Sequence, residues 1–131
     1  MEPLAWTPSL AALRRRVEDA ASASFNSVLV NWYRDGRDSN GWHADDEPEL
    51  GHEPVIASLS LGATRFMSLK RRDGHARYRL PLTDGDLLVM RGDSQSAWLH
   101  AITKSVRVTD GRLNLTFRRV AIAHDDAGLT S

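Results

Sequence analysis

Three residues of this chain have side chains that bind divalent metal ions and stand at a suitable spacing: His43, Asp45 and His100. In an extended segment, residues two positions apart point to the same side, so the His43 imidazole and the Asp45 carboxylate can reach one ion together. His100 follows an apolar strand at 86–90 and a polar turn at 91–96, and closed β topologies bring such distant strands side by side. Two imidazoles and one carboxylate leave coordination positions open, as in non-haem Fe(II) oxygenases, although the same set also suits zinc.

A His-x-Asp pattern alone is most often a surface turn, so this prediction needs support from other segments. The other histidines, His52, His75 and His124, are assigned to solvated loops or turns.

The support comes from two strands that each carry a polar side. On one side of residues 112–118 lie Arg112, Asn114, Thr116 and Arg118, and on the other lie Leu113, Leu115 and Phe117. Residues 26–33 likewise place Leu29, Asn31 and Tyr33 together and Val28, Val30 and Trp32 opposite. These polar sides either face solvent or line a pocket for a small polar ligand.

The two arginines of residues 112–118 suggest the charge of that ligand. Arginine binds carboxylates through planar, bidentate contacts and does not lose its charge. Arg112 and Arg118 lie about 20 Å apart along a fully extended strand, so a five-carbon diacid meets both only through strand curvature and side-chain reach. The spacing permits a dicarboxylate without requiring one.

The elements that must position these residues are one helix and a β core. A capped amphipathic helix is predicted at about 8–22, because Thr7-Pro8-Ser9 precedes a run in which Leu10, Leu13 and Val17 recur at three and four residues. The β core covers about 25–120, where six β-rich runs suggest about seven strands: 25–33, 54–62, 64–71, 76–82, 86–90 and 113–120. We therefore expect one mainly β domain over 1–131, with one N-terminal helix covering a sheet of a jelly-roll core and a frayed tail at 121–131.

Composition excludes several classes of protein. The 17 basic and 17 acidic residues cancel, so a nucleic acid would have to be met by a local patch rather than by overall charge. Cysteine is absent, which excludes disulfides, zinc–thiolate sites and a cysteine nucleophile. No apolar run approaches the roughly 18 residues of a membrane span. We expect a soluble, cytoplasmic, bacterial-type protein that is a monomer and does not bind membranes.

Six motifs together resemble the AlkB-type nucleic-acid dealkylases, a branch of the Fe(II) and 2-oxoglutarate dioxygenases. In chain order they are Asn31-Trp32-Tyr33 with Asp35-Gly36, Gly41-Trp42-His43-Ala44-Asp45-Asp46-Glu47-Pro48, Ser58-Leu59-Ser60-Leu61-Gly62, Gly85-Asp86-Leu87-Leu88-Val89-Met90, His100, and Arg112-Leu113-Asn114-Leu115-Thr116-Phe117-Arg118. Their order and rough spacing both agree with the family.

The resemblance implies a double-stranded β-helix and a role for each matched residue. His43, Asp45 and His100 would bind Fe(II) as the catalytic centre. Arg112 with Tyr33 would hold the distal carboxylate of 2-oxoglutarate, Arg118 with Asn31 would lie near its chelating end, and Asn114 and Thr116 would line the same pocket. Asp46, Glu47 and Arg71 would contact the substrate base. The implied activity is O2-dependent oxidative demethylation of alkylated bases in single-stranded DNA or RNA, as in DNA repair.

The sequence departs from the family in having only 30 residues ahead of Asn31, where the family carries a lid that grips the flipped base. A base flipped from its stack must be held by compensating contacts. The alternatives are therefore a lid-less, non-catalytic remnant that binds metal and 2-oxoglutarate, or the same oxygenase chemistry on a non-nucleic substrate.

One segment is strongly basic. Lys70, Arg71 and Arg72 face Arg77 and Arg79 across an Asp73-Gly74 turn. Such a hairpin is either a solvated face or a phosphate track.

Overall fold

In the computed structural model, which describes residues 6–121, helix α1 spans Pro8–Ala21. The Thr7 side chain accepts a hydrogen bond from the Leu10 backbone N–H at 3.1 Å, and Pro8 occupies the first turn, where no N–H partner is needed. Ser22 ends the helix in the left-handed conformation with φ of 52°. The predicted helix is thus confirmed, with its end one residue earlier than expected.

Eight strands follow the helix: β1 (Ser27–Tyr33), β2 (Asn40–His43), β3 (Ile56–Gly62), β4 (Arg65–Arg71), β5 (Arg77–Leu82), β6 (Leu87–Met90), β7 (Trp98–Ile102) and β8 (Arg112–Arg118). Two short 3₁₀ helices, η1 (Pro48–Leu50) and η2 (Gly92–Ser94), lie in the connections. The six β-rich runs correspond to β1, β3, β4, β5, β6 and β8. The short strands β2 and β7 were not among those runs, and they carry the two candidate histidine ligands.

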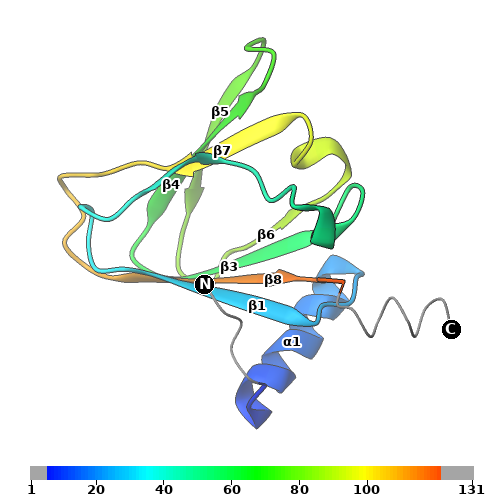
Figure 1. Cartoon of the computed structure of the whole chain (residues 1–131). Helices are drawn as coiled ribbons and strands as arrows, with labels where there is room; N and C mark the ends of the chain where they lie inside the picture. The colour runs from blue at the N-terminus through cyan, green and yellow to red at the C-terminus, as the bar shows by residue number, and fades with distance from the viewer. Residues whose placement is uncertain (1–5, 122–131) are drawn as a thin grey trace, which may run out of the picture.

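The strands form two antiparallel sheets that face each other (Figure 1). The first sheet has the order β1-β8-β3-β6 and the second has the order β2-β7-β4-β5. This alternation of strands between two sheets is the jelly-roll, or double-stranded β-helix, arrangement. The predicted fold class is therefore confirmed.

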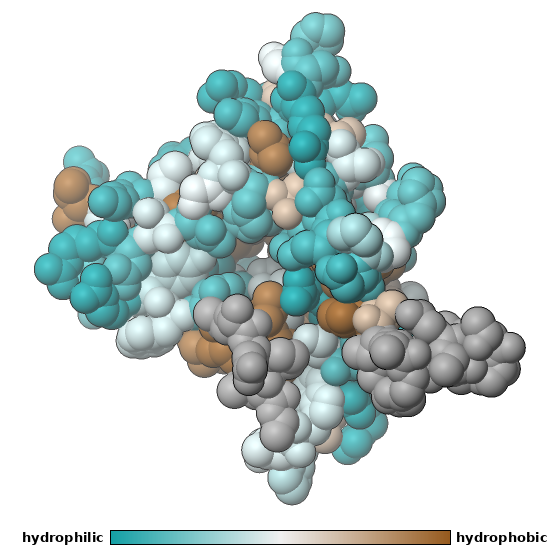
Figure 2. All heavy atoms as spheres, in the orientation of Figure 1, coloured by the Kyte–Doolittle hydropathy of each residue, from teal (hydrophilic) through white to brown (hydrophobic). Residues whose placement is uncertain are grey.

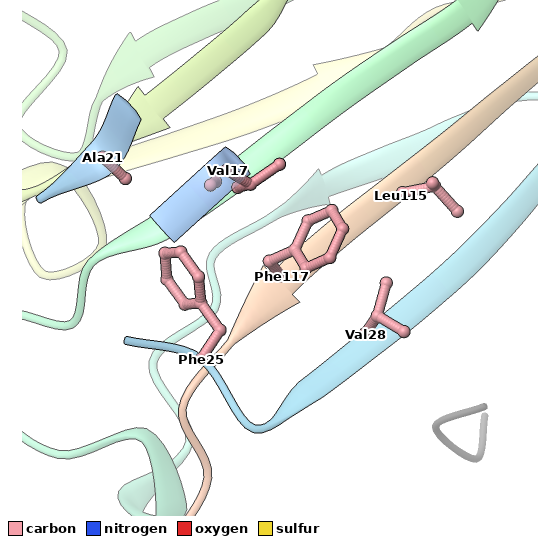
Figure 3. Packing of buried hydrophobic residues seen from close by; sticks show 7 residues of the cluster. Val17, Ala21, Phe25, Val28, Leu115 and Phe117 are labelled. Atoms are coloured by element: carbon pink, nitrogen blue, oxygen red, sulfur yellow. The ribbon is translucent and has the colours of Figure 1, made fainter. Parts of the chain in front are cut away.

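Helix α1 covers the outer face of the first sheet. Val17 and Ala21 of the helix pack with Val28, Leu115 and Phe117 of the strands, and all five are buried (Figure 3). Because side chains alternate along a strand, this packing turns the other residues of β1, β3 and β8 toward the second sheet. The inner face of the first sheet therefore carries the polar row that the sequence predicted.

The loop between β1 and β2 is held by close backbone contacts. Gly36 donates its N–H to the Val108 carbonyl at 2.8 Å and accepts from Ser105 at 2.8 Å. A Cβ at Gly36 would lie 1.7 Å from the Ser105 carbonyl oxygen, so only glycine fits there. Arg65, which is 2% exposed, donates to the carbonyls of Asp35, Asp38 and Thr103 and ties the same loop to the end of β7.

No helix within residues 6–121 combines the length and apolar character that crossing a membrane requires. Most of the predicted frayed tail, together with His124, lies outside the described residues.

Candidate metal and anion site

The three candidate metal ligands meet between the two sheets. His43 at the end of β2 is paired directly with His100 of β7, and Asp45 follows two residues after His43. One ligand atom from each residue lies within 4.8 Å of the others, and the His100 Nε2 to Asp45 Oδ2 distance is 3.9 Å. An ion with bonds of about 2.1 Å holds ligands at right angles about 3 Å apart, so these side chains need to draw in by about 1 to 2 Å.

Two features favour the metal-binding forms of the histidines. The Nδ1 of His43 lies 2.7 Å from the Gly41 carbonyl oxygen, which can only accept, so Nδ1 is the donor and Nε2 is the nitrogen that can bind an ion. Burial, and to a lesser extent His43, lowers the pKa of His100 to about 4, so this imidazole is neutral at pH 7. Burial also raises the pKa of Asp45, against the opposing charges of His43 and Arg118.

The position of Asp45 is fixed by a residue that the sequence did not indicate. Gln95, 1% exposed and located just after η2, accepts a hydrogen bond at its Oε1 from the Asp45 backbone N–H at 2.8 Å. Gln95 stands in a polar turn of ordinary composition, so no pattern in the sequence distinguishes it.

A cavity of about 220 Å³ opens beside the triad. In terms of liquid volume it has room for about seven water molecules. Its lining combines the triad with polar residues of the first sheet and apolar residues of both sheets: Leu29, Asn31, Tyr33, Asn40, His43, Asp45, Ser58, Met67, Met90, His100, Ile102, Arg112, Asn114 and Thr116. Five of the six residues expected to bind the cosubstrate therefore line the same cavity as the triad.

Arg112 is the most unusual residue of this lining because its charge is buried and poorly paired. It is 1% exposed, one guanidinium nitrogen donates to the Ser60 hydroxyl at 3.0 Å, and its Nε and Nη1 have no protein partner in the described structure. Its guanidinium carbon lies 5.0 Å from the centre of the Tyr33 ring. Burial lowers the pKa of Arg112, although arginine keeps its charge at neutral pH. A buried cation with two unpaired donors is suited to binding an anion.

Asn114 and Thr116 form a fixed polar wall next to Arg112. The Asn114 amide donates to the Ser58 hydroxyl at 2.7 Å and to the Leu59 carbonyl at 3.2 Å, and its oxygen accepts from the Thr116 hydroxyl at 2.7 Å. Ser58 and Ser60 alternate with leucines in the sequence, a period of two that marks one strand face as polar.

Arg118 is placed differently from the other five predicted cosubstrate residues. It pairs with Ser27 in the β1–β8 register, whereas Asn31 is opposite Asn114, and Arg118 is absent from the cavity lining. Its guanidinium lies 3.7 Å from the Glu47 carboxylate, and its charge acts on Asp45. The structure thus puts Arg118 beside the metal ligands but does not pair it with Asn31.

The three predicted substrate residues lie outside this cavity. Asp46 accepts a hydrogen bond from Arg72 at 2.9 Å, and Arg71 bonds to Asp73 at 2.9 Å. Glu47 is half exposed beside Arg118. They flank the triad in sequence or across the second sheet, and no contact in the structure tests their role.

The residues present fit an iron ion and an anionic cosubstrate. The donor set is two imidazoles and one carboxylate, and the contact of the His43 Nδ1 with the Gly41 carbonyl orients one of the imidazoles. An unpaired buried cation lines the same cavity, so a ligand bound there can contact both.

Comparison with known proteins agrees with this chemistry. Residues 1–118 match the family model described as the 2OG-Fe(II) oxygenase superfamily. The chain is 45% identical over 124 residues to the alpha-ketoglutarate-dependent dioxygenase alkB homolog 3 of Mus musculus, covering 88% of this chain and 43% of that protein. It is 36% identical over 130 residues to the DNA oxidative demethylase ALKBH2 of Homo sapiens, covering 93% of this chain and 50% of that protein.

The chain therefore spans about half the length of these relatives or less. A solved structure of OsALKBH1 superimposes with a TM-score of 0.64 at 22% identity, covering 83% of this chain and 63% of that one. That likeness supports the fold alone.

Proposed function

Since the chain belongs to the 2OG-Fe(II) oxygenase superfamily, we propose that it uses Fe(II), 2-oxoglutarate and O2 to demethylate alkylated bases of DNA or RNA. The activity and the substrate are taken from relatives of which this chain covers only part. Those relatives include an alpha-ketoglutarate-dependent dioxygenase and a DNA oxidative demethylase.

The observation that carries the proposal is one cavity that combines a metal-ligand triad with a buried, unpaired guanidinium. His43, Asp45 and His100 offer ligand atoms at one part of the lining, and Arg112 offers two free N–H donors at another. 2-Oxoglutarate has the matching groups, a chelating keto acid and a second carboxylate. A substrate without a carboxylate would leave the Arg112 charge buried without a counterion.

The residues around the cavity have separate tasks in this proposal. Arg112 binds the distal carboxylate, and its contact with Tyr33 keeps the guanidinium plane in position. Asn114 and Thr116 shape the wall along the cosubstrate because their hydrogen bonds fix both side chains. Gln95 holds the backbone of Asp45, and Gly41 orients His43, so these two ligands are partly oriented before an ion binds.

The bound cofactor supplies the oxidising chemistry. With Fe(II) held by His43, Asp45 and His100, one oxygen atom of O2 would enter 2-oxoglutarate, which would lose CO2 to become succinate, and the other would enter a C–H bond of the N-methyl group. The resulting N-hydroxymethyl group leaves as formaldehyde, and the nitrogen regains its hydrogen. We assign the recognition of the base to Asp46, Glu47 and Arg71, which flank the triad, and expect the protein to act as a monomer.

The test is succinate production with Fe(II), 2-oxoglutarate and a methylated single-stranded oligonucleotide. We expect turnover by the wild type and a rate of succinate production at least about 100-fold lower in His43→Ala. The control His75→Ala, which removes an exposed imidazole of the β4–β5 turn, should keep the wild-type rate. A wild type that makes no succinate with any methylated oligonucleotide contradicts the proposal. Thermal stabilisation by Mn(II) and 2-oxoglutarate without turnover would identify a binding protein instead.

A further inference from the structure

The outer face of the second sheet carries aromatic and basic side chains that the site does not use. Met67 and His100 face the cavity, so the alternate residues of β4 and β7 face away from it. Strand pairing puts Arg79 opposite Ser68 and Arg77 opposite Lys70, on this same outer face. The Lys70 ammonium lies 4.3 Å from the Trp42 ring, which places Trp42 of β2 there as well.

We call Trp42, Phe66, Lys70, Arg77 and Arg79 the outer basic face. Two of its cations lie over its two aromatic rings: Lys70 over Trp42, and Arg79 over Phe66 at 3.9 Å. The rings remain accessible, with Trp42 41% and Phe66 39% exposed. Exposed rings and cations held side by side on a rigid sheet form a preorganised surface.

The charges of the β4–β5 hairpin divide between two sets. Arg71 and Arg72 are neutralised by ion pairs to Asp73 and Asp46, each at 2.9 Å. Within residues 6–121, none of the three cations of the outer basic face has a carboxylate within ion-pairing distance. The hairpin projects from the body of the molecule, and hydrophilic side chains cover it in Figure 2. Among the basic residues of the β4–β5 hairpin, the positive charge available to a partner therefore lies on the outer basic face.

We propose that the outer basic face binds single-stranded nucleic acid next to the nucleotide that enters the cavity. Bases stack on exposed aromatic rings whatever their sequence, and unpaired arginines and lysines contact the phosphates. A protein of zero net charge gains affinity for a polyanion only through such a local patch. This inference rests on the proposed function, since it extends the substrate path from that site.

The arrangement of β2 connects the two surfaces. β2 is an edge strand of the second sheet, with His43 turned into the cavity and the neighbouring Trp42 turned to the outer basic face. A nucleic-acid strand that leaves the cavity mouth can therefore pass around this edge. Sheet β2-β7-β4-β5 thus offers the target base its inner face and the flanking nucleotides its outer face.

The test measures binding of an unmodified single-stranded oligonucleotide of about 16 nucleotides by fluorescence anisotropy. We expect R77E/R79E to weaken binding at least about 10-fold and to reduce the slope of log affinity against log salt by about 1.4, or 0.7 for each lost phosphate contact. R15E/R16E makes the same change in charge on α1, on the opposite side of the molecule, and should leave the affinity within about 2-fold. Phe66→Ala should weaken binding about 5-fold or more, and Phe66→Trp should restore it.

Equal effects of R77E/R79E and R15E/R16E would overturn the inference, as would an unmodified oligonucleotide that the wild type does not bind. Thermal stabilisation by Mn(II) and 2-oxoglutarate, measured in every variant, verifies that the fold and the cavity are intact. Failure of succinate production with Arg77-dependent binding retained would refute the proposed function alone. Succinate production with no effect of R77E/R79E on binding would refute this inference alone.

Discussion

Replacing Arg112 by methionine should change ligand affinity and apo stability in opposite directions. In the metal-free and ligand-free protein, the guanidinium is buried with two unpaired nitrogens and one hydrogen bond to Ser60. Methionine has a similar length and no charge to desolvate. We therefore expect Arg112→Met to leave the free energy of unfolding unchanged or to raise it by up to about 2 kcal/mol.

The affinity for 2-oxoglutarate should fall steeply in the same variant. Removing one partner of a buried, hydrogen-bonded charge pair costs about 2 to 4 kcal/mol, because the other charge stays buried without a partner. At about 1.4 kcal/mol for each factor of ten, this is a loss of roughly 30-fold to 1000-fold.

A thermal-shift titration with Mn(II) and 2-oxoglutarate measures both effects. At a 2-oxoglutarate concentration 100 times the wild-type Kd, binding stabilises the wild type by about 2.7 kcal/mol, whereas a variant with 100-fold weaker binding gains only about 0.4 kcal/mol. For a domain of this size, the wild-type gain corresponds to a rise in Tm of roughly 10 °C. Arg107→Met, which removes an exposed arginine, is the control and should behave as the wild type.

Two results would refute this reasoning. One is a clear loss of apo stability in Arg112→Met, which would mean that the guanidinium stabilises the fold rather than serving to bind the carboxylate of 2-oxoglutarate. The other is an undiminished rise in Tm with 2-oxoglutarate, which would place the carboxylate elsewhere in the cavity.

Three further predictions concern the metal, the fold and pH. Mn(II) should raise the Tm of the wild type and of His75→Ala but not of His43→Ala. An equal rise in all three would exclude His43, Asp45 and His100 as the metal site. Arg65→Met should lower the free energy of unfolding in urea by at least about 3 kcal/mol, because three partly buried carbonyls lose their donor. A loss below about 1 kcal/mol would contradict this. The pKa of His100 is about 4 in the fold and 6.5 unfolded, so the unfolded state binds more protons between these values. Metal-free protein should therefore lose up to about 1.4 kcal/mol per unit as the pH falls from 6.5 to 5, and His100→Gln, measured by the same urea titration, should show a flatter dependence.

Local patterns in the sequence were enough to predict the helix and the polar strand faces. Leu10, Leu13 and Val17 follow the helical period, and they pack on the first sheet as that period requires. In β8, residues alternate between Arg112, Asn114 and Thr116 in the cavity and Leu115 and Phe117 in the core. Such periods depend only on backbone geometry, so they can be read without knowing the fold.

The motif spacing also predicted the three candidate metal ligands, which the structure brings together, but the sequence could not show how distant segments meet. β2 and β7 are only 4 and 5 residues long, so neither has enough residues for a clear period. Their pairing, which brings His43 against His100, is a contact between residues 57 positions apart and is decided by the closure of the jelly roll.

Contacts between distant parts of the chain decided the remaining features of the site and of the basic hairpin. Gln95 and Arg65 carry no local signal, yet one fixes Asp45 and the other ties the β1–β2 loop to β7, because the fold encloses them next to unpaired backbone groups. The basic residues of the exposed hairpin also differ in their partners: Arg71 and Arg72 reach carboxylates, and Lys70, Arg77 and Arg79 do not. By itself the sequence determined which side chains share a strand face. Only the tertiary structure decided which of their charges are paired, because a partner such as Asp46 for Arg72 comes from a distant part of the chain.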